Sequence, residues 1–274
     1  MNQRYSLHQI TQAEACSFSE TAYSRFKFGD TAVAEQFGKE LFAGFIAKYA
    51  DFVLAQKEIL ILPSPYYAIP TASDYLCHYF RTELNYFLFN HNRRSCVTAK
   101  IHRNQTYVQD YGNMSYEQRV NLIANDTYYI DRTFIEGKCC LLIDDIKITG
   151  SHEHTVNRIL KQYDVQGDFF FLYYAELTNK DIDPKIENHF NYFAVKTVED
   201  LISLMQSPRF AFNTRIIKYI LLLPQAECMK IHAAITSQQR RELFEWAISN
   251  NYHQIDEYLS LIHISEPTRQ AEIS

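Results

Sequence analysis

Two adjacent aspartates, Asp144 and Asp145, are the residues in this sequence best suited to chemistry. The apolar run Cys139 to Ile143 precedes them. The short turn Thr149-Gly150-Ser151 and a helical pattern at residues 151–162 follow. Ligands of parallel sheets bind beyond the carboxyl ends of strands, and a helix N-terminus offers unpaired N–H groups to a phosphate. The carboxylates can accept hydrogen bonds from vicinal sugar hydroxyls. The segment therefore predicts a site for a phosphorylated sugar, in preference to a plain strand-to-helix turn with solvated aspartates.

The elements that must position this segment alternate along the chain. Apolar runs predict strands, and apolar residues at helical spacing predict helices. The strands are expected at 58–62, 95–101, 139–143 and 169–175, and the helices at 31–49, 71–89 and 151–162, with a further helix start at residue 115. Such alternation favours an α/β fold, with a Rossmann-like parallel sheet flanked by helices.

The pattern changes after residue 175. Helices are expected at 198–205, 213–223 and 237–258, separated by prolines. We therefore predict a core at 1–175 and a mostly helical C-terminal extension at 176–258. The sequence assigns this extension no chemistry, and core packing is favoured over a partner surface as its role.

The last residues, 259–274, have a different origin in our interpretation. Leu259 to Arg269 corresponds in order to the translation of a transposase-type sequencing adapter, so the natural sequence is expected to be truncated near Tyr258, with its true C-terminus beyond that residue. A translated adapter carries no information about the fold. A genuine polar tail is the alternative, and the codons of the source DNA distinguish the two.

Composition limits the class of protein. The chain has 274 residues, 47% of them hydrophobic and 22% charged, with a formal net charge of -5, which gives no basic field for nucleic acid. No apolar stretch approaches the roughly 20 residues of a membrane span, and the N-terminus has no signal-peptide core. None of the six cysteines forms a CxxC pair or a zinc-type cluster, and Cys139 and Cys140 are expected to be buried apolar residues. A cytoplasmic protein with no membrane or nucleic-acid partner is the expectation.

The segment Cys140 to His152 resembles the phosphoribosyl-pyrophosphate (PRPP) motif of type I phosphoribosyltransferases. That motif has apolar residues, an acidic pair, two apolar residues and then Thr-Thr-Gly-x-Thr. The resemblance implies that Asp144 and Asp145 are the catalytic pair, which holds the ribose hydroxyls. It implies a 5′-phosphate loop made of Ile148, Thr149, Gly150, Ser151 and His152. Three positions depart from the motif: Lys147 replaces an apolar residue, and Ile148 and His152 replace hydroxyl residues. The loop keeps its backbone donors, which makes binding better supported than catalysis.

Further segments resemble the ComF-like group of these enzymes. Tyr23 to Asp30 is similar to its N-terminal Lys-Phe/Tyr-x-Gly-Asp stretch, and Ser64, Pro65 and Tyr66 occupy the place of the pyrophosphate loop. Lys100 and Arg103 begin a segment similar to the flexible loop, in which Thr106, Gln109, Ser115, Arg119 and Asn121 follow. The resemblance implies that Lys100 and Arg103 close over the pyrophosphate; a solvated loop is the alternative.

The resemblance implies a transferase of the pentosyltransferase class. It would bind PRPP together with Mg²⁺, held mainly through PRPP and with no protein side chain assigned as a metal ligand. Phosphoribosyl would pass to an unidentified nitrogen acceptor, for which a nucleobase is one candidate, with release of pyrophosphate. A homodimer is left open.

Two other interpretations remain. The first is a catalytically weak or inactive sensor of PRPP or a nucleotide, with a helical tail that binds a partner; Ile148 and His152 favour it, whereas the acidic pair and the basic loop favour an enzyme. The second is a generic Rossmann-like nucleotide binder, which neither GxGxxG nor GxxxxGK[ST] supports.

Overall fold

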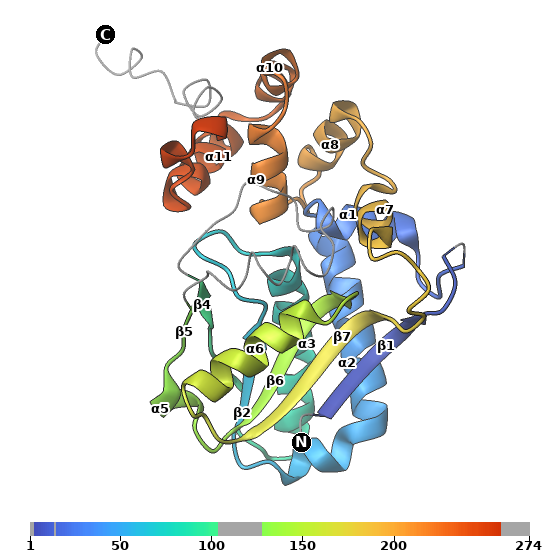
Figure 1. The fold of residues 1–274 in the computed structure, drawn as a ribbon, viewed down its shortest axis with the longest axis vertical. Coiled ribbons are helices and arrows are strands. Elements are labelled where there is room, and N and C mark those ends of the chain that lie inside the picture. Colours follow the sequence, from blue (N-terminus) through green and yellow to red (C-terminus); the bar gives the residue numbers. More distant parts are fainter. Residues whose placement is uncertain (1–2, 14, 104–127, 259–274) are drawn as a thin grey trace.

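The computed structural model describes residues 3–13, 15–103 and 128–258 and shows one parallel sheet with helices on both faces (Figure 1). The sheet has five strands in the order β1-β7-β6-β2-β3, all of them parallel to their neighbours. The strands are β1 (Gln3–Ile10), β2 (Ile59–Pro63), β3 (Val97–Thr98), β6 (Cys139–Lys147) and β7 (Asp168–Leu177). The predicted parallel α/β architecture is thus confirmed.

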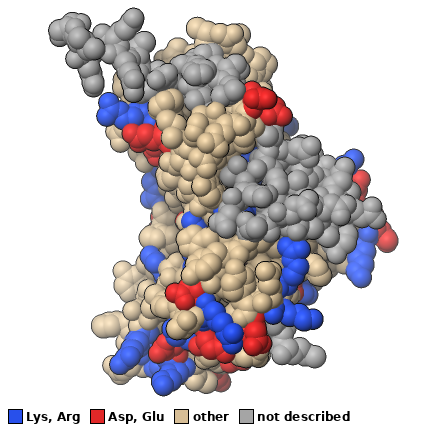
Figure 2. All heavy atoms as spheres, turned by 60° about the vertical axis from the view of Figure 1, so that its left-hand side comes forward, with Lys and Arg blue, Asp and Glu red and all other residues tan. Residues whose placement is uncertain are grey.

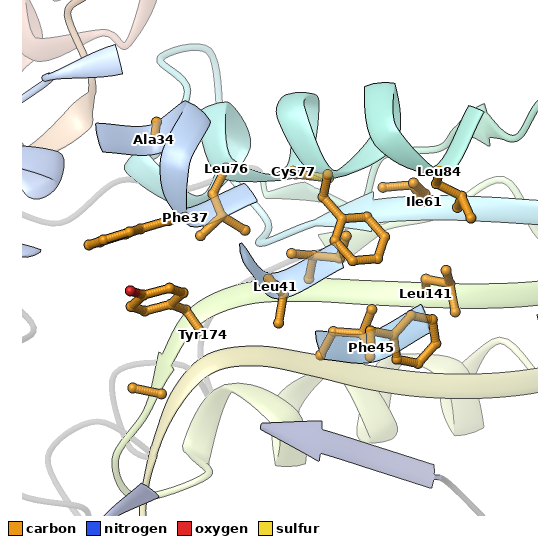
Figure 3. Packing of buried hydrophobic residues seen from close by; sticks show 14 of the residues in the cluster. Ala34, Phe37, Leu41, Phe45, Ile61, Leu76, Cys77, Leu84, Leu141 and Tyr174 are labelled. Atoms are coloured by element: carbon orange, nitrogen blue, oxygen red, sulfur yellow. The ribbon is translucent and has the colours of Figure 1, made fainter. Parts of the chain in front are cut away.

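The two faces of the sheet are covered by different helices. Neighbouring strand residues point to opposite faces, so Leu141 packs with α2 (Thr31–Ala55) and α3 (Ala72–Asn90), whereas Leu142 packs with α6 (Ser151–Gln162). Figure 3 shows the first of these layers, in which aromatic rings of α2 lie against the strands. Burial on both faces explains why the strands are continuous apolar runs.

Helices α2 and α3 approach each other closely at Gly38. A Cβ atom at this position would lie 2.7 Å from the Cβ of Tyr79 and 2.9 Å from the carbonyl oxygen of Leu76. The absence of a side chain at Gly38 therefore allows the two helices to pack as closely as they do.

The turn between α1 (Glu20–Lys27) and α2 holds the N-terminal motif in place. Gly29 adopts φ +88°, and the Asp30 carboxylate caps α2 by accepting a hydrogen bond from the Ala32 N–H at 3.1 Å. The same carboxylate is 2.7 Å from the Arg25 guanidinium. These contacts fix the direction in which α1 ends, and with it the position of Lys27.

The C-terminal helices lie over the carboxyl ends of the strands (Figure 1). They are α7 (Ile186–Tyr192), α8 (Val198–Met205), α9 (Thr214–Leu221), α10 (Gln225–Ala234) and α11 (Ser237–Ser249). They build a hydrophobic cluster of their own, to which Phe28 and Ile69 of the sheet region contribute. Asn250 accepts hydrogen bonds from the Ala68 and Ile69 N–H groups at 3.0 and 3.2 Å. The helical region is therefore joined to the sheet region by apolar and polar contacts.

Several elements differ from the sequence-based expectations. Strand β1 was not predicted, because an edge strand paired only with β7 needs no apolar run. The strand expected at 95–101 is limited to Val97–Thr98, and the helix expected at 237–258 ends at Ser249, before the 3₁₀ helix η2 (Tyr252–Gln254). The sequence also did not indicate α5 (Arg132–Ile135), α7, α10 or the small antiparallel pair of β4 (His102–Arg103) and β5 (Tyr128–Tyr129).

Some predictions lie outside the described residues. These are the helix start at residue 115, the later part of the flexible-loop segment and the tail at 259–274. Within the described ranges, no helix has the length and apolarity that a membrane span requires. Figure 2 shows acidic and basic side chains intermingled on the lower part of one face.

Candidate functional site

A cavity of about 410 Å³ lies between the carboxyl ends of β2 and β6 and the C-terminal helix α9. Its size falls in the range of small-molecule sites. Among the described residues, every site residue expected from the sequence contributes to its wall except Tyr66 and Lys100. Segments that are far apart in the chain, around residues 64, 103, 144–153 and 214–223, thus meet at one site.

The acidic pair lies within β6 and not in a loop beyond it, which corrects the expected strand end at Ile143. Because successive strand residues face opposite ways, the two carboxylates have different partners. Asp145 accepts hydrogen bonds from the Lys27 ammonium, at 2.5 Å, and from the Tyr23 hydroxyl, both of α1. Asp144 accepts a hydrogen bond from His152 Nδ1 at 2.8 Å.

These surroundings shift the two pKa values in opposite directions. Burial opposes ionisation of Asp144, but the charge and hydrogen bond of His152, together with hydrogen bonds from Asp145 and Ser64, outweigh it and hold the pKa of Asp144 well below its ordinary value. Burial and, to a smaller extent, the neighbouring Asp144 raise the pKa of Asp145, which the Lys27 ammonium offsets only in part. Asp144 therefore ionises readily, whereas ionisation of Asp145 depends on the neighbouring Lys27 ammonium.

The turn before α6 places a glycine with positive φ at the N-terminus of a helix. Gly150 adopts φ +76° and occupies the N-cap position of α6 without supplying a side-chain cap. The Thr149 hydroxyl is 3.0 Å from that of Ser151, and Ile148 packs against the core beneath α2 and α3. The first N–H groups of a helix have no partner within it. This loop can accordingly present backbone and hydroxyl donors to a phosphate.

Lys147 and Glu153 belong to an ion-pair network beside this loop. The Lys147 ammonium lies 2.8 Å from Glu176 and 3.6 Å from Glu153, and Arg4 lies 2.6 Å from Glu153. Lys147 is thus bound to carboxylates on neighbouring elements instead of pointing to solvent. The network compensates the negative charge that Glu153 brings to the first turn of α6.

Of the residues expected to bind pyrophosphate, some line the cavity and others lie behind its lining. Ser64 and Pro65 line the cavity, together with Arg103. The Ser64 hydroxyl lies near enough to Asp144 to help lower its pKa, yet it makes no hydrogen bond of normal geometry within the described part of the chain. Lys100 lies behind the lining, with its ammonium 3.7 Å from the centre of the Tyr66 ring and 3.0 Å from the Tyr67 carbonyl oxygen.

Helix α9 forms a wall of the cavity that the sequence analysis did not assign. Ile216, Ile217 and Ile220 face the cluster of the C-terminal helices. Arg215 and Lys218 lie on the other side of α9 and line the cavity. The sequence of α9 shows apolar residues on one side of a helix and basic residues on the other. Only the folded chain shows that the basic side faces the cavity.

Comparison with known proteins assigns the family. A family model described as "PRTase ComF-like" matches residues 1–264. The chain belongs to the ComF-like phosphoribosyltransferase family. For this ComF-like chain, the comparison with curated proteins found no significant match.

Three solved structures are similar to parts of this ComF-like chain. Adenine phosphoribosyltransferase from Saccharomyces cerevisiae is 15% identical, with a TM-score of 0.31 over 51% of this chain and 69% of its own. Hypoxanthine phosphoribosyltransferase from Staphylococcus aureus is 11% identical, with a TM-score of 0.33 over 52% and 74%. The corresponding enzyme from Trypanosoma cruzi, complexed with the product IMP, is 14% identical, with a TM-score of 0.30 over 55% and 77%. The family assignment rests on the family model.

Proposed function

We propose that this protein binds PRPP with Mg²⁺ and transfers its phosphoribosyl group to a nitrogen acceptor, releasing pyrophosphate. One observation carries the proposal: the acidic pair, the Gly150 loop and the Ser64 and Arg103 side chains line a single cavity. The three chemical groups of PRPP, a sugar diol, a 5′-phosphate and a pyrophosphate, need these three kinds of partner. Family membership supports the same assignment.

The proposed reaction is a substitution at C1 of the ribose. The lone pair of the acceptor nitrogen forms the new N–C1 bond, the C1–O bond breaks, and pyrophosphate leaves with the bonding electrons. A proton on the acceptor nitrogen passes to water. The carboxylate of Asp144, whose pKa is low, would stabilise positive charge that develops on the ribose.

The ribose would have to share the carboxylates with their present partners. Asp145 is bound by Lys27 and Tyr23, and Asp144 by His152. Each carboxylate oxygen can accept more than one hydrogen bond, so the diol can add to these contacts or replace the one from Lys27. In either case Lys27 is placed to hold Asp145 ionised before the sugar arrives.

The residues of the cavity fit Mg²⁺ bound through its substrate. In the described part of the chain, no group of three or more His, Cys, Asp or Glu side chains is arranged to hold a metal ion. Mg²⁺ commonly needs only one or two carboxylates when substrate phosphates supply further oxygen ligands, and Asp144 and Asp145 offer these. When bound, Mg²⁺ would neutralise charge on the leaving pyrophosphate.

Turnover and binding are tested separately. Wild-type protein, Mg²⁺ and PRPP are incubated with a panel of nitrogen acceptors, and pyrophosphate release is measured beside PRPP binding. Acceptor-dependent release supports the transferase. Binding without release by any acceptor favours the second candidate, a PRPP sensor, which the replacement of loop hydroxyls by Ile148 and His152 also favours. Absence of PRPP binding excludes both.

A further inference from the structure

The loop at residues 64–71 joins β2 to α3 and begins with residues expected to face pyrophosphate. Ser64 and Pro65 line the cavity. A loop has no regular ladder of backbone hydrogen bonds, so its N–H and C=O groups need partners from elsewhere. Those partners decide where the loop lies, and with it how Ser64 is presented to a substrate.

Asn250 of the C-terminal region is the partner of two consecutive N–H groups of this loop. Its side-chain oxygen accepts hydrogen bonds from the Ala68 N–H at 3.0 Å and from the Ile69 N–H at 3.2 Å. Asn250 is 2% exposed and Ile69 is fully buried, so solvent does not compete for these bonds. Because a buried N–H group without a partner is costly, the position of the loop depends on Asn250.

The end of α11 aims Asn250 at the loop. The Asn250 N–H donates to the Trp246 carbonyl oxygen at 3.1 Å, in the last turn of the helix. The next residue, Asn251, adopts φ +57°, a left-handed conformation that asparagine tolerates better than most residues. The Asn251 side-chain amide donates to the Tyr67 hydroxyl at 3.1 Å. Two consecutive asparagines therefore contact the same loop.

Helix α11 is itself fixed by contacts away from the cavity. Leu243 and Ala247 are buried in the hydrophobic cluster of the C-terminal helices. At the other end of α11, Thr236 and Gln239 cap each other reciprocally, and the Gln239 amide donates to the Met205 carbonyl oxygen at 2.6 Å. The helix is thus a rigid support from which Asn250 reaches the loop.

A second set of contacts holds the loop residues just before Ala68. The Lys100 ammonium donates to the Tyr67 carbonyl oxygen at 3.0 Å, and the Arg103 N–H donates to the Tyr66 carbonyl oxygen at 3.4 Å. Residues 66–69 are therefore bound through their backbone by two segments that are far apart in the chain. Removing Asn250 would leave residues 68–69 without their side-chain acceptor while residues 66–67 keep their donors.

We propose that Asn250 is a positioning residue for the pyrophosphate of PRPP, which acts through the backbone of residues 68–69 on Ser64 and Pro65. The proposal rests on the proposed function, and it gives the C-terminal helical region a part in substrate binding. Asn250 is not among the residues that line the cavity, so it acts on the substrate only through the loop. Such positioning matters because a misplacement of about 1 Å can cost about 10²-fold in rate.

Binding of PRPP and of its two phosphate-bearing parts tests the proposal. PRPP, pyrophosphate and ribose 5-phosphate are each titrated with Mg²⁺ by calorimetry into the wild type, Asn250→Ala and Asn250→Asp. Asn250→Ala loses two hydrogen bonds, so it should bind PRPP and pyrophosphate about tenfold more weakly and ribose 5-phosphate within about twofold of wild type. Asn250→Asp keeps an acceptor oxygen and should stay within about threefold for all three ligands.

Asn85→Ala is the matched control. The Asn85 side-chain oxygen accepts a hydrogen bond from the Cys96 N–H at 2.9 Å, just before β3 and at the end of the sheet away from the cavity. Its loss should lower stability and leave the three Kd values within about twofold of wild type. Amide hydrogen exchange of Ala68 and Ile69 should be faster in Asn250→Ala and unchanged in Asn85→Ala, which measures the loop without ligand.

Asn251→Gly provides a second, milder variant if Asn250→Ala does not fold. Glycine suits φ +57°, and the variant loses only the contact with Tyr67. It should weaken binding of PRPP and pyrophosphate about threefold and leave that of ribose 5-phosphate unchanged.

Three results would overturn the proposal. They are equal weakening of pyrophosphate and ribose 5-phosphate, unchanged PRPP binding in the folded variants of Asn250 and Asn251, and no recovery of affinity in Asn250→Asp. Each of them leaves the proposed function in place as long as the wild type binds PRPP. Failure of the wild type to bind PRPP removes the proposed function, and this proposal with it.

Discussion

Replacing Lys27 with methionine is expected to destabilise the protein through the buried carboxylate of Asp145. The ammonium lies 2.5 Å from this carboxylate, and the side chains of Lys27 and Asp145 are only 12% and 7% exposed. Removing one member of a buried ion pair typically costs about 3–5 kcal/mol. Because the Tyr23 hydroxyl still donates to Asp145, we expect the lower end of that range, about 3 kcal/mol at pH 8.

The loss should depend on pH in a defined direction. The pKa of Asp145 in the folded protein is already raised by burial, and loss of Lys27 raises it further. At pH values between the pKa of Asp145 in the unfolded state and its higher pKa in the folded state, the folded protein binds one more proton than the unfolded chain. The free energy of unfolding therefore decreases as pH rises through that interval. The decrease is at most about 1.4 kcal/mol for each pH unit. The Lys27→Met variant should therefore be closer to wild type at pH 5 than at pH 8.

Urea denaturation followed by far-UV circular dichroism at pH 5 and pH 8 measures this effect. Adding Asp145→Asn to Lys27→Met removes the unpaired charge and should recover most of the loss at pH 8. Lys39→Met is the control, because the Lys39 side chain is 52% exposed in its pair with Glu35, and surface pairs contribute about 0–1 kcal/mol. The same loss at both pH values, or no recovery with Asp145→Asn, would refute the reasoning.

Three further predictions concern the core and the loop. Gly38→Ala should lower the free energy of unfolding by about 1–3 kcal/mol in urea denaturation, because α2 and α3 must separate; wild-type stability would contradict this. Gly150→Ala should cost about 1–2 kcal/mol, from its left-handed backbone, and should weaken PRPP binding in calorimetry. Its matched control is Gly137→Ala, with φ +72° and open space around it, which should cost similar stability without affecting PRPP binding. His152→Ala should raise the pKa of Asp144 in carboxyl-carbon NMR titrations, and an unchanged pKa would disprove the role of the imidazole.

The sheet was predictable because its signals are local. Strands buried on both faces need continuous apolar runs, so β2, β6 and β7 could be recognised from residues within each strand. The acidic pair and the Gly150 turn were recognisable for the same reason, since their chemistry and spacing lie within a few residues of each other. Strand β1 has no such signal, because its pairing with β7 joins residues more than 160 positions apart, as in Gln3 and Phe170.

The parts of the site that the sequence did not indicate depend on contacts between distant segments. Nothing near Lys27 shows that its ammonium reaches Asp145, 118 residues away. The spacing of Arg215 and Lys218 indicates a helix face, but the docking of α9 over the cavity follows from contacts such as that of Asn213 with Lys27. His152 stands where the related motif has a hydroxyl residue, and its hydrogen bond to Asp144 became evident only with the backbone in place.

Calorimetric titration of PRPP in the presence of Mg²⁺ tests the central claim most directly. The wild type and Asp168→Asn should bind PRPP equally, because Asp168 is exposed and begins β7 at the opposite end of the sheet from the cavity. The double variant Asp144→Asn/Asp145→Asn, if folded by circular dichroism, should bind at least about tenfold more weakly, since hydrogen bonds to charged groups contribute about 1.5–3 kcal/mol each. Absence of binding by the wild type, or equal binding by the double variant, would contradict the account.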